Sequence, residues 1–351
     1  MEKVLADRES RVAGCLFGLA LGDATGAPTE FLSVDEILRR WPAGGPEGPA
    51  GDPARVTDDT QMALAVGEAL AEALDGRDMS PAPVESHMRA AFVEWLNSPD
   101  NNRAPGRTCL RACELLEAGW HWLEATVKSS KGCGANMRVA PVGLLTAEAH
   151  GVNEVGRAAV AQFQAALTHG HPTALAASDL TAYAVALLAA GVEPRVLVEV
   201  LRDYVLSQRT VYHVDWLGEL WQRPGVESPE AFIARGWEEC LSVLQRLEAA
   251  LSAPDYEADP CLATGQGWVA EEALATGLLC FLLYPGEPLK ALRRAAVTSG
   301  DSDSIACLTG AFAGAHLGVD CWPREWVGRI EYRDRLGRLA AELSKGTAPA
   351  A

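Results

Sequence analysis

Residues 12–23 of this 351-residue chain read VAGCLFGLALGD, and glycine recurs there at every fourth position, as Gly14, Gly18 and Gly22. Because residues four apart share one face of an α-helix, the stretch predicts a helix with one face free of side chains. Each such glycine destabilises a helix interior by roughly 0.5–1 kcal/mol relative to alanine. We therefore expect this face to pack closely against another helix at the centre of the fold, with Asp23 at the end of the first helix.

Helical periodicity extends over nearly the whole chain. Apolar residues recur at helical spacing, alanine is abundant, and alternating β-branched runs typical of strands are scarce. Further helices are expected over residues 61–74, 180–190, 194–205, 229–250, 268–283 and 305–317. The pattern predicts an all-α, compact multi-helix fold. No shift in composition marks a boundary, so we expect one domain over residues 1–345, a frayed tail over 346–351, and a loop or lid over 42–53.

The composition excludes several classes of protein. The chain has 47 Asp+Glu against 30 Lys+Arg, a net charge of −17, which disfavours binding to nucleic acid or to an anionic membrane surface. The longest uncharged apolar runs fall short of the roughly 18 residues of a membrane span. Nine scattered cysteines without a CxxC pair indicate reduced thiols. We expect a cytoplasmic protein with no nucleic-acid or membrane partner, and the sequence does not indicate an oligomeric state.

Two acidic segments directly precede expected helices, VTDDTQ at 56–61 and TSGDSDS at 298–304. Helix capping is one interpretation, because Asp, Ser and Thr are preferred N-caps and acidic residues favour the helix dipole. The paired carboxylates exceed what capping requires, and they repel each other unless a cation or proton lies between them. Oxygen ligands without nearby Cys or His favour Mg²⁺, Mn²⁺ or Ca²⁺. Brought together, the two segments could hold two divalent ions, which is a hydrolytic arrangement.

Three further segments offer polar or aromatic groups for a ligand. Residues 129–138, SSKGCGANMR, combine glycines that let an anion approach backbone N–H groups with donors from Lys131 and Asn136, although a plain turn is the commoner interpretation. His169 and His171 are too few for a zinc site, so a packed or ligand-facing role is expected. Trp268, at a helix entrance, either stacks on a base or packs against its own helix.

Taken together and in this order, the segments resemble the ADP-ribosylglycohydrolase family from Gly14 to Gly318. The matching motifs are GCLFG (14–18), GDA (22–24), PTEF (28–31), TDDT (57–60), SKGCG (130–134), MR (137–138), AP (140–141), TH (168–169), HP (171–172), GW (267–268), EEAL (271–274) and GDSDS (300–304).

The resemblance implies an ADP-ribosylglycohydrolase-like fold with a binuclear centre of two Mg²⁺ ions, Mn²⁺ being the alternative. The metal ligands carried over by position are Thr57, Asp58, Asp59, Asp301, Asp303 and Ser304. The catalytic candidates are Glu30, Asp58 and Asp303. The substrate-binding candidates are Lys131, Gly132, Cys133, Gly134, Asn136, Met137, His169 and Trp268, with residues 131–138 on the pyrophosphate and His169 on the ribose side.

The activity implied by the resemblance is metal-dependent hydrolysis of the glycosidic bond in an ADP-ribosylated protein, releasing ADP-ribose, with arginine as the preferred acceptor. Such cleavage passes through an oxocarbenium-like state and needs a positioned water, which two metal ions can orient and acidify. Two alternatives stay open: a non-catalytic ADP-ribose-binding or crystallin-like structural relative, and a metal-independent protein whose aspartates only cap helices. The acceptor linkage, the protein target and the identity of the general base are not indicated.

Overall fold

The computed structural model describes residues 6–345, which form nineteen α-helices and three short 3₁₀-helices. The α-helices are α1 (Arg8–Gly26), α2 (Val34–Arg40), α3 (Asp58–Asp75), α4 (Pro81–Asn97), α5 (Arg107–Glu117), α6 (Trp122–Ala125), α7 (Ala140–Gly143), α8 (Ala147–His150), α9 (Glu154–Ala166), α10 (Pro172–Ala189), α11 (Pro194–Gln208), α12 (Val214–Leu217), α13 (Pro229–Ser252), α14 (Cys261–Thr264), α15 (Ala270–Leu283), α16 (Pro288–Ala296), α17 (Ser302–Leu317), α18 (Arg324–Arg329) and α19 (Arg333–Ser344). The 3₁₀-helices are η1 (Ala27–Thr29), η2 (Cys133–Ala135) and η3 (Val319–Cys321). Isolated bridges are the only β pairing among residues 6–345, so the predicted all-α fold is confirmed. The tail predicted over 346–351 lies outside the described residues.

The six helices expected from periodicity are all present, with shifted ends. They correspond to α3, α10, α11, α13, α15 and α17. Several begin earlier than expected because a polar N-cap precedes the apolar stripe. The side chain of Thr57 caps α3 by accepting from the Asp59 N–H, and the His171 ring caps α10 by accepting from the Thr173 N–H, with Pro172 as the first residue of that helix.

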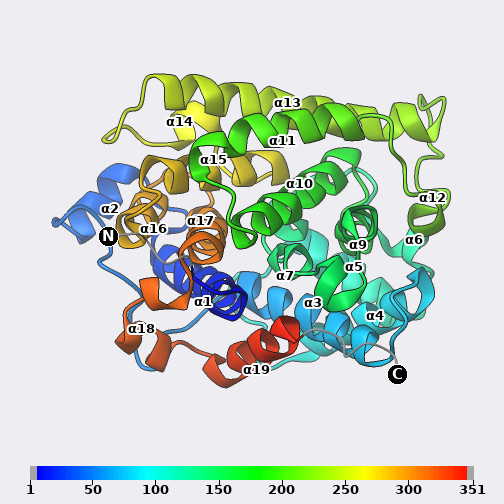
Figure 1. Ribbon diagram of the computed structural model, residues 1–351, viewed down its shortest axis with the longest axis horizontal. Helices are drawn as coiled ribbons and strands as arrows, with labels where there is room; N and C mark the ends of the chain where they lie inside the picture. The colour runs from blue at the N-terminus through cyan, green and yellow to red at the C-terminus, as the bar shows by residue number, and fades with distance from the viewer. Residues whose placement is uncertain (1–5, 346–351) are drawn as a thin grey trace.

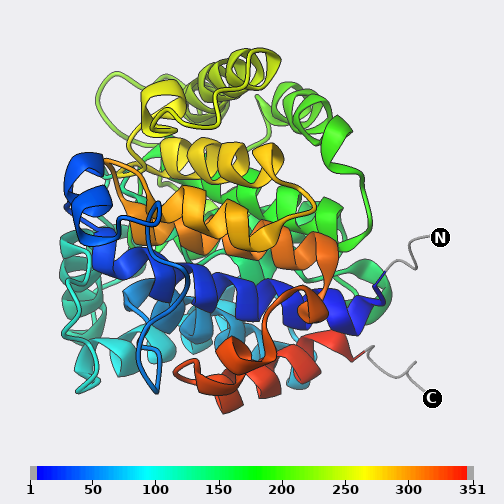
Figure 2. The same ribbon diagram turned by 90° about the vertical axis from the view of Figure 1, so that its left-hand side faces the viewer.

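The glycine face of α1 packs against α17 at the centre of the molecule, where Figures 1 and 2 both draw the two helices side by side. The helices run antiparallel. A Cβ placed on Gly18 would lie 2.2 Å from the carbonyl oxygen of Gly310, and one on Gly314 would lie 1.8 Å from that of Gly14. No side chain fits at these crossing points, so the expected close helix contact is confirmed. It brings the C-terminal end of α1 to the N-terminal end of α17.

The remaining helices form layers on both sides of this pair. In Figure 2, α13 lies above α15 and α17, while α3 and α19 lie below α1. A continuous apolar core joins the layers. All nine cysteines are free thiols and seven of them are buried, which agrees with the expected reduced state. α10 is the one helix among the described residues that is long and apolar enough to cross a membrane. Since 78% of that stretch is buried inside the fold, this is weak evidence for a span.

Asp179 is a buried carboxylate on α10, and it makes stability depend on pH. It accepts hydrogen bonds from the Gln162 side-chain amide at 2.8 Å and from the Tyr204 hydroxyl at 2.9 Å, yet burial raises its pKa to about 6. A raised folded-state pKa favours the protonated form. The stabilisation is therefore complete below the unfolded pKa of about 4, and about 3 kcal/mol is lost as pH rises to about 6.

Asp179→Asn is expected to remove the contribution of Asp179 to the pH dependence of stability. The measurement is the free energy of unfolding in urea at pH 4.5 and at pH 7. The asparagine can accept from Tyr204 and donate to the Gln162 side-chain oxygen, which now lacks a partner. Asp203→Asn, on the exposed face of α11, is the matched control and should keep the wild-type difference in the free energy of unfolding between the two pH values. An unchanged difference in Asp179→Asn would contradict the raised pKa of Asp179.

Candidate metal centre and substrate site

The two acidic segments meet at the N-terminal ends of α3 and α17, and Glu30 joins them from the end of η1. One carboxylate oxygen from each of Glu30, Asp301 and Asp303 lies within 4.8 Å of the other two. The Thr57 hydroxyl donates a hydrogen bond to Asp303, which links the start of α3 to this group. Three segments far apart in the sequence thus converge on one acidic cluster.

Helix capping does not account for these carboxylates. At α3 the caps are Thr57 and, from outside the helix, Asp23, whose oxygens accept from the backbone N–H groups of Thr57 at 3.0 Å and Thr60 at 3.1 Å. Asp23 lies in the last turn of α1, which continues three residues further than expected, to Gly26, and its side chain is fully buried. At α17 the side chain of Asp301 makes no capping hydrogen bond. Capping therefore leaves the clustering of these carboxylates unexplained, although Asp58 accepts from the Gly106 N–H at 3.2 Å and Asp303 from the Ser304 N–H at 3.0 Å.

Burial and mutual repulsion keep protons on the cluster. Burial is the main cause that raises the pKa of Asp58 to about 7 and that of Glu30 to about 9, and the charge of Asp303 adds to both shifts. The same causes raise the pKa of Asp59 and Asp301 well above the usual range. A divalent cation would replace those protons, because it stabilises the ionised form of each carboxylate.

The residues present fit a hard cation. Asp59 has a carboxylate oxygen that is buried without a hydrogen-bond partner, which is costly unless an ion satisfies it. The donors are carboxylates together with the hydroxyls of Thr57 and Ser304, the oxygen set that Mg²⁺ and Mn²⁺ prefer. One departure is Cys133, whose thiol donates to Asp301 at 2.8 Å. The cluster can therefore hold a metal through oxygen atoms, as the resemblance implies.

Glu30 lies in a tight turn whose geometry is unusual. The Leu32 N–H donates to the Thr29 carbonyl at 3.1 Å, Glu30 is extended, and Phe31 follows with φ 62°. These are the features of a type II turn, which favours glycine at the position of Phe31. A bulky residue there costs of order 1–3 kcal/mol. The Phe31 ring is 68% exposed and stacks on Trp268, with ring centroids 5.5 Å apart and an interplanar angle of 14°.

The loop over residues 129–138 lies against the acidic cluster. Its backbone is fixed by Trp268, whose carbonyl accepts from the Cys133 N–H at 3.1 Å. The His169 ring packs against Gly132 and Gly134, where a Cβ would approach within 3.3 and 3.1 Å of it. The structure therefore brings Gly132, Cys133, Gly134, His169 and Trp268 together beside Asp301.

Three other substrate-binding candidates have different surroundings. The Lys131 ammonium is paired with Glu239 at 2.5 Å and with the buried Glu271, so its charge is already balanced. Asn136 is fully buried and donates to the Ala270 carbonyl at 3.0 Å, and Met137 is buried too. Asn136 and Met137 support the loop from the core side. A direct role in binding stays a prediction for all three.

Sequence reasoning missed two supporting residues, Asp23 as a second cap of α3 and Arg138 behind His169. Arg138 is fully buried and donates to Gln164 at 2.8 Å and to the Thr168 hydroxyl at 2.9 Å. Thr168 is in turn 2.8 Å from a ring nitrogen of His169. Burial, together with the nearby Arg138 charge, lowers the pKa of His169 to about 3. The only sequence signals were the motif positions of Asp23 and Arg138.

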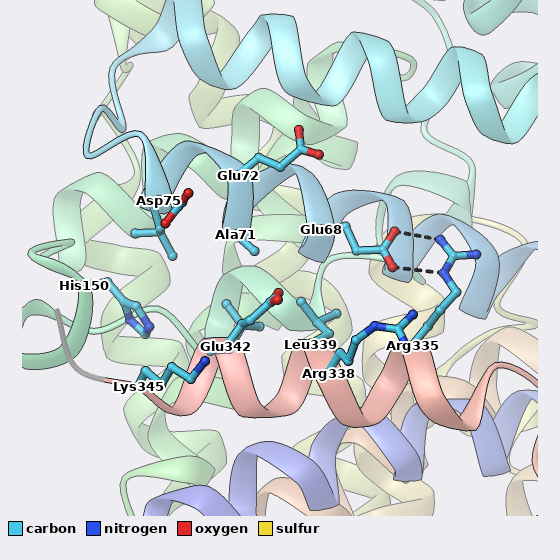
Figure 3. A pocket seen from close by; sticks show the side chains of 12 residues that line it. Glu68, Ala71, Glu72, Asp75, His150, Arg335, Arg338, Leu339, Glu342 and Lys345 are labelled. Atoms are coloured by element: carbon cyan, nitrogen blue, oxygen red, sulfur yellow. Dashed lines mark hydrogen bonds and ion pairs between the residues drawn. The ribbon is translucent and has the colours of Figure 1, made fainter.

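A cavity of about 650 Å³ opens beside Glu30. Its walls come from residues 50–57 and 103–104, and they include Thr57, Arg55 and Arg103. Arg103 is neutralised by an ion pair with Glu331, whereas Arg55 is exposed and forms no ion pair among residues 6–345. The loop expected over residues 42–53 thus contributes to this cavity. A second hollow of about 600 Å³, drawn in Figure 3, lies between the far end of α3 and α19 and contains none of the acidic cluster.

Comparison with known proteins gives one consistent similarity. The sequence model described as ADP-ribosylglycohydrolase matches residues 5–350. The chain is 28% identical to ADP-ribosylhydrolase ARH3 of Bos taurus, covering 96% of this chain and 93% of that protein. It is 28% identical to ADP-ribosylarginine hydrolase Tri1 of Pseudomonas putida (strain GB-1), covering 95% and 77%. A solved structure titled ADP-ribosylglycohydrolase-related protein complex shares the fold, with a TM-score of 0.66, 24% identity, and coverage of 96% and 98%.

Proposed function

Because this chain belongs to the ADP-ribosylglycohydrolase family, we propose that it hydrolyses the glycosidic bond between ADP-ribose and a protein side chain. Arginine is the favoured acceptor. The observation that carries the proposal is the convergence of Glu30, Asp301 and Asp303, whose oxygens lie within 4.8 Å of one another beside the Gly132–Gly134 backbone. An acidic centre beside a glycine-containing loop that a ligand can approach closely is what such a reaction requires.

The proposed reaction uses divalent metal ions held by side-chain oxygen atoms. Thr57, Asp58, Asp59, Asp301, Asp303 and Ser304 would hold two Mg²⁺ ions, or Mn²⁺ in their place. Divalent cations at such a site stabilise developing negative charge on oxygen and make water more acidic. They also supply the positive charge that a chain of net charge −17 lacks for binding a pyrophosphate.

Glu30 is the proposed general base. The four aspartates of the cluster are buried, whereas Glu30 is half-buried and lines the open cavity, so it can reach both the cluster and an incoming substrate. Its carboxylate would take the proton of the attacking water, and the loop at residues 132–134, where glycines allow close approach to the backbone, would lie against the pyrophosphate. His169, kept neutral by burial, would hold a ribose hydroxyl.

Asp59→Asn is expected to abolish stabilisation by metal while leaving a folded protein. In the wild type, Mg²⁺ at a hundredfold excess over Kd should stabilise the fold by about 3 kcal/mol, and EDTA should reverse the effect. The variant should show no Mg²⁺-dependent rise in Tm, because it loses a buried charged ligand. Asp75→Asn, at the exposed far end of α3, is the control and should respond like the wild type. No Mg²⁺ or EDTA effect on wild-type Tm would favour the metal-independent alternative.

The acceptor is proposed to enter through the cavity beside Glu30. Arg55 is the unbalanced positive charge on its wall, so acidic residues flanking the modified side chain should improve binding. Arg55→Glu is expected to lower kcat/KM for an acidic-flanked peptide relative to a basic-flanked one by about fivefold. Arg246→Glu on α13 makes the same change in net charge at an exposed site and should not alter the ratio. An unchanged ratio in Arg55→Glu would place the acceptor elsewhere.

The proposed function is tested by measuring the release of ADP-ribose from arginine-modified and serine-modified peptides, with and without Mg²⁺. Mg²⁺-dependent release from the arginine peptide, with little from the serine peptide, is the expected result. Release from the serine peptide alone would overturn the arginine assignment. Binding of ADP-ribose without release from either peptide would favour the non-catalytic alternative.

A further inference from the structure

Phe31 combines features that a surface turn does not need. It occupies the glycine-favoured position of its turn with φ 62°, and its side chain is 68% exposed. An exposed ring gains little from burial, so burial does not offset the unfavourable backbone. What the ring does make is the stack on Trp268, at 5.5 Å and 14°.

The stack connects the turn that carries Glu30 to a segment fixed on the other side of the acidic cluster. The Gln266 carbonyl, two residues before Trp268, accepts from the Asp301 N–H at 2.8 Å. The Trp268 carbonyl accepts from the Cys133 N–H at 3.1 Å. Trp268 is therefore anchored both to α17, through its N-cap, and to the loop over residues 129–138. Phe31, next to Glu30 in the chain, rests on this anchored ring.

We propose that the Phe31–Trp268 stack positions the Glu30 carboxylate against Asp301 and Asp303, which makes Phe31 a positioning residue for the reaction. The inference rests on the proposed role of Glu30. It explains why a phenylalanine stands where the turn favours glycine: the turn loses stability, and Glu30 gains a fixed orientation.

Substitutions at position 31 separate the ring from the backbone. Phe31→Gly removes the ring and supplies the residue that the turn favours. We expect an equal or higher Tm, a kcat lower by ten- to a hundredfold on the arginine-modified peptide, and a Kd for ADP-ribose within about twofold of wild type. Phe31→Tyr keeps a ring and should restore kcat. Phe31→Ala removes the ring but keeps the unfavourable φ, so it should lose as much kcat as Phe31→Gly at a lower Tm.

Trp268→Ala tests the same contact from the other ring. If the two rings act through one stack, the double variant Phe31→Gly/Trp268→Ala should have a kcat no lower than the slower single variant. The predicted role of Trp268 in substrate binding is measured separately, as a change in KM. Trp120→Ala removes an aromatic residue that is 50% exposed and whose carbonyl accepts from Arg89 on α4, and it should leave kcat unchanged.

Several outcomes would overturn the positioning role of Phe31. These are a wild-type kcat in Phe31→Gly, a fall of its kcat and Tm together, and multiplicative losses in the double variant. Failure of the inference is distinguishable from failure of the proposed function. Full activity in Glu30→Gln would overturn the role of Glu30 itself. An inactive Glu30→Gln beside a fully active Phe31→Gly would overturn the stack alone.

Discussion

Glu30→Gln is expected to lower kcat by about 10²–10⁴-fold while the Kd for ADP-ribose stays within about twofold of wild type. The amide keeps the size of the carboxylate but cannot accept the proton of the attacking water. Since the backbone of residues 132–134 is untouched, the pyrophosphate should bind as before. The measurements are single-turnover release of ADP-ribose from the modified peptide and calorimetric titration with ADP-ribose.

Glu94→Gln, an exposed carboxylate on α4, is the matched control and should be fully active. Burial and the neighbouring charges raise the pKa of Glu30, so the neutral glutamine should not destabilise the fold, and its Tm should equal or exceed that of the wild type. A Glu30→Gln variant that turns over at the wild-type rate would move the base to one of the aspartates. A variant that also loses ADP-ribose binding would make Glu30 a binding residue.

Of the two helix faces in the central contact, the sequence predicted that of α1 but not that of α17. Gly14, Gly18 and Gly22 stand out because three glycines at helical spacing are costly unless a close neighbour stabilises them. Their partner face consists of Ser302, Ala306, Gly310 and Gly314, opposite a stripe that also includes Gly26. Small residues at a spacing of four are common in a chain this rich in alanine, so the partner could not be distinguished.

The acidic cluster was predictable because each half has a local excess of carboxylates, and repulsion within a short segment requires a partner. The contacts of Lys131 were not predictable, since Glu239 and Glu271 come from α13 and α15 and leave no local pattern. The Phe31–Trp268 stack was equally hidden. A single aromatic residue has no periodicity, and the turn at Glu30 shows its unusual geometry only in three dimensions.

Gly310→Ala and Gly314→Ala are expected to destabilise the fold strongly, although each change adds only one methyl group. A Cβ on Gly310 would lie 1.9 Å from the Gly18 carbonyl oxygen, and that backbone cannot move without separating α1 from α17. Each change should cost about 3 kcal/mol, measured by unfolding in urea.

The double variant should cost less than the sum, because the first separation makes room for the second. Gly337→Ala, in an open position on α19, is the control and should stabilise by about 0.5–1 kcal/mol. An unchanged unfolding midpoint in Gly310→Ala would contradict the close contact. Since α17 carries Asp301 and Asp303 at its start, separating the helices should weaken Mg²⁺ binding as well.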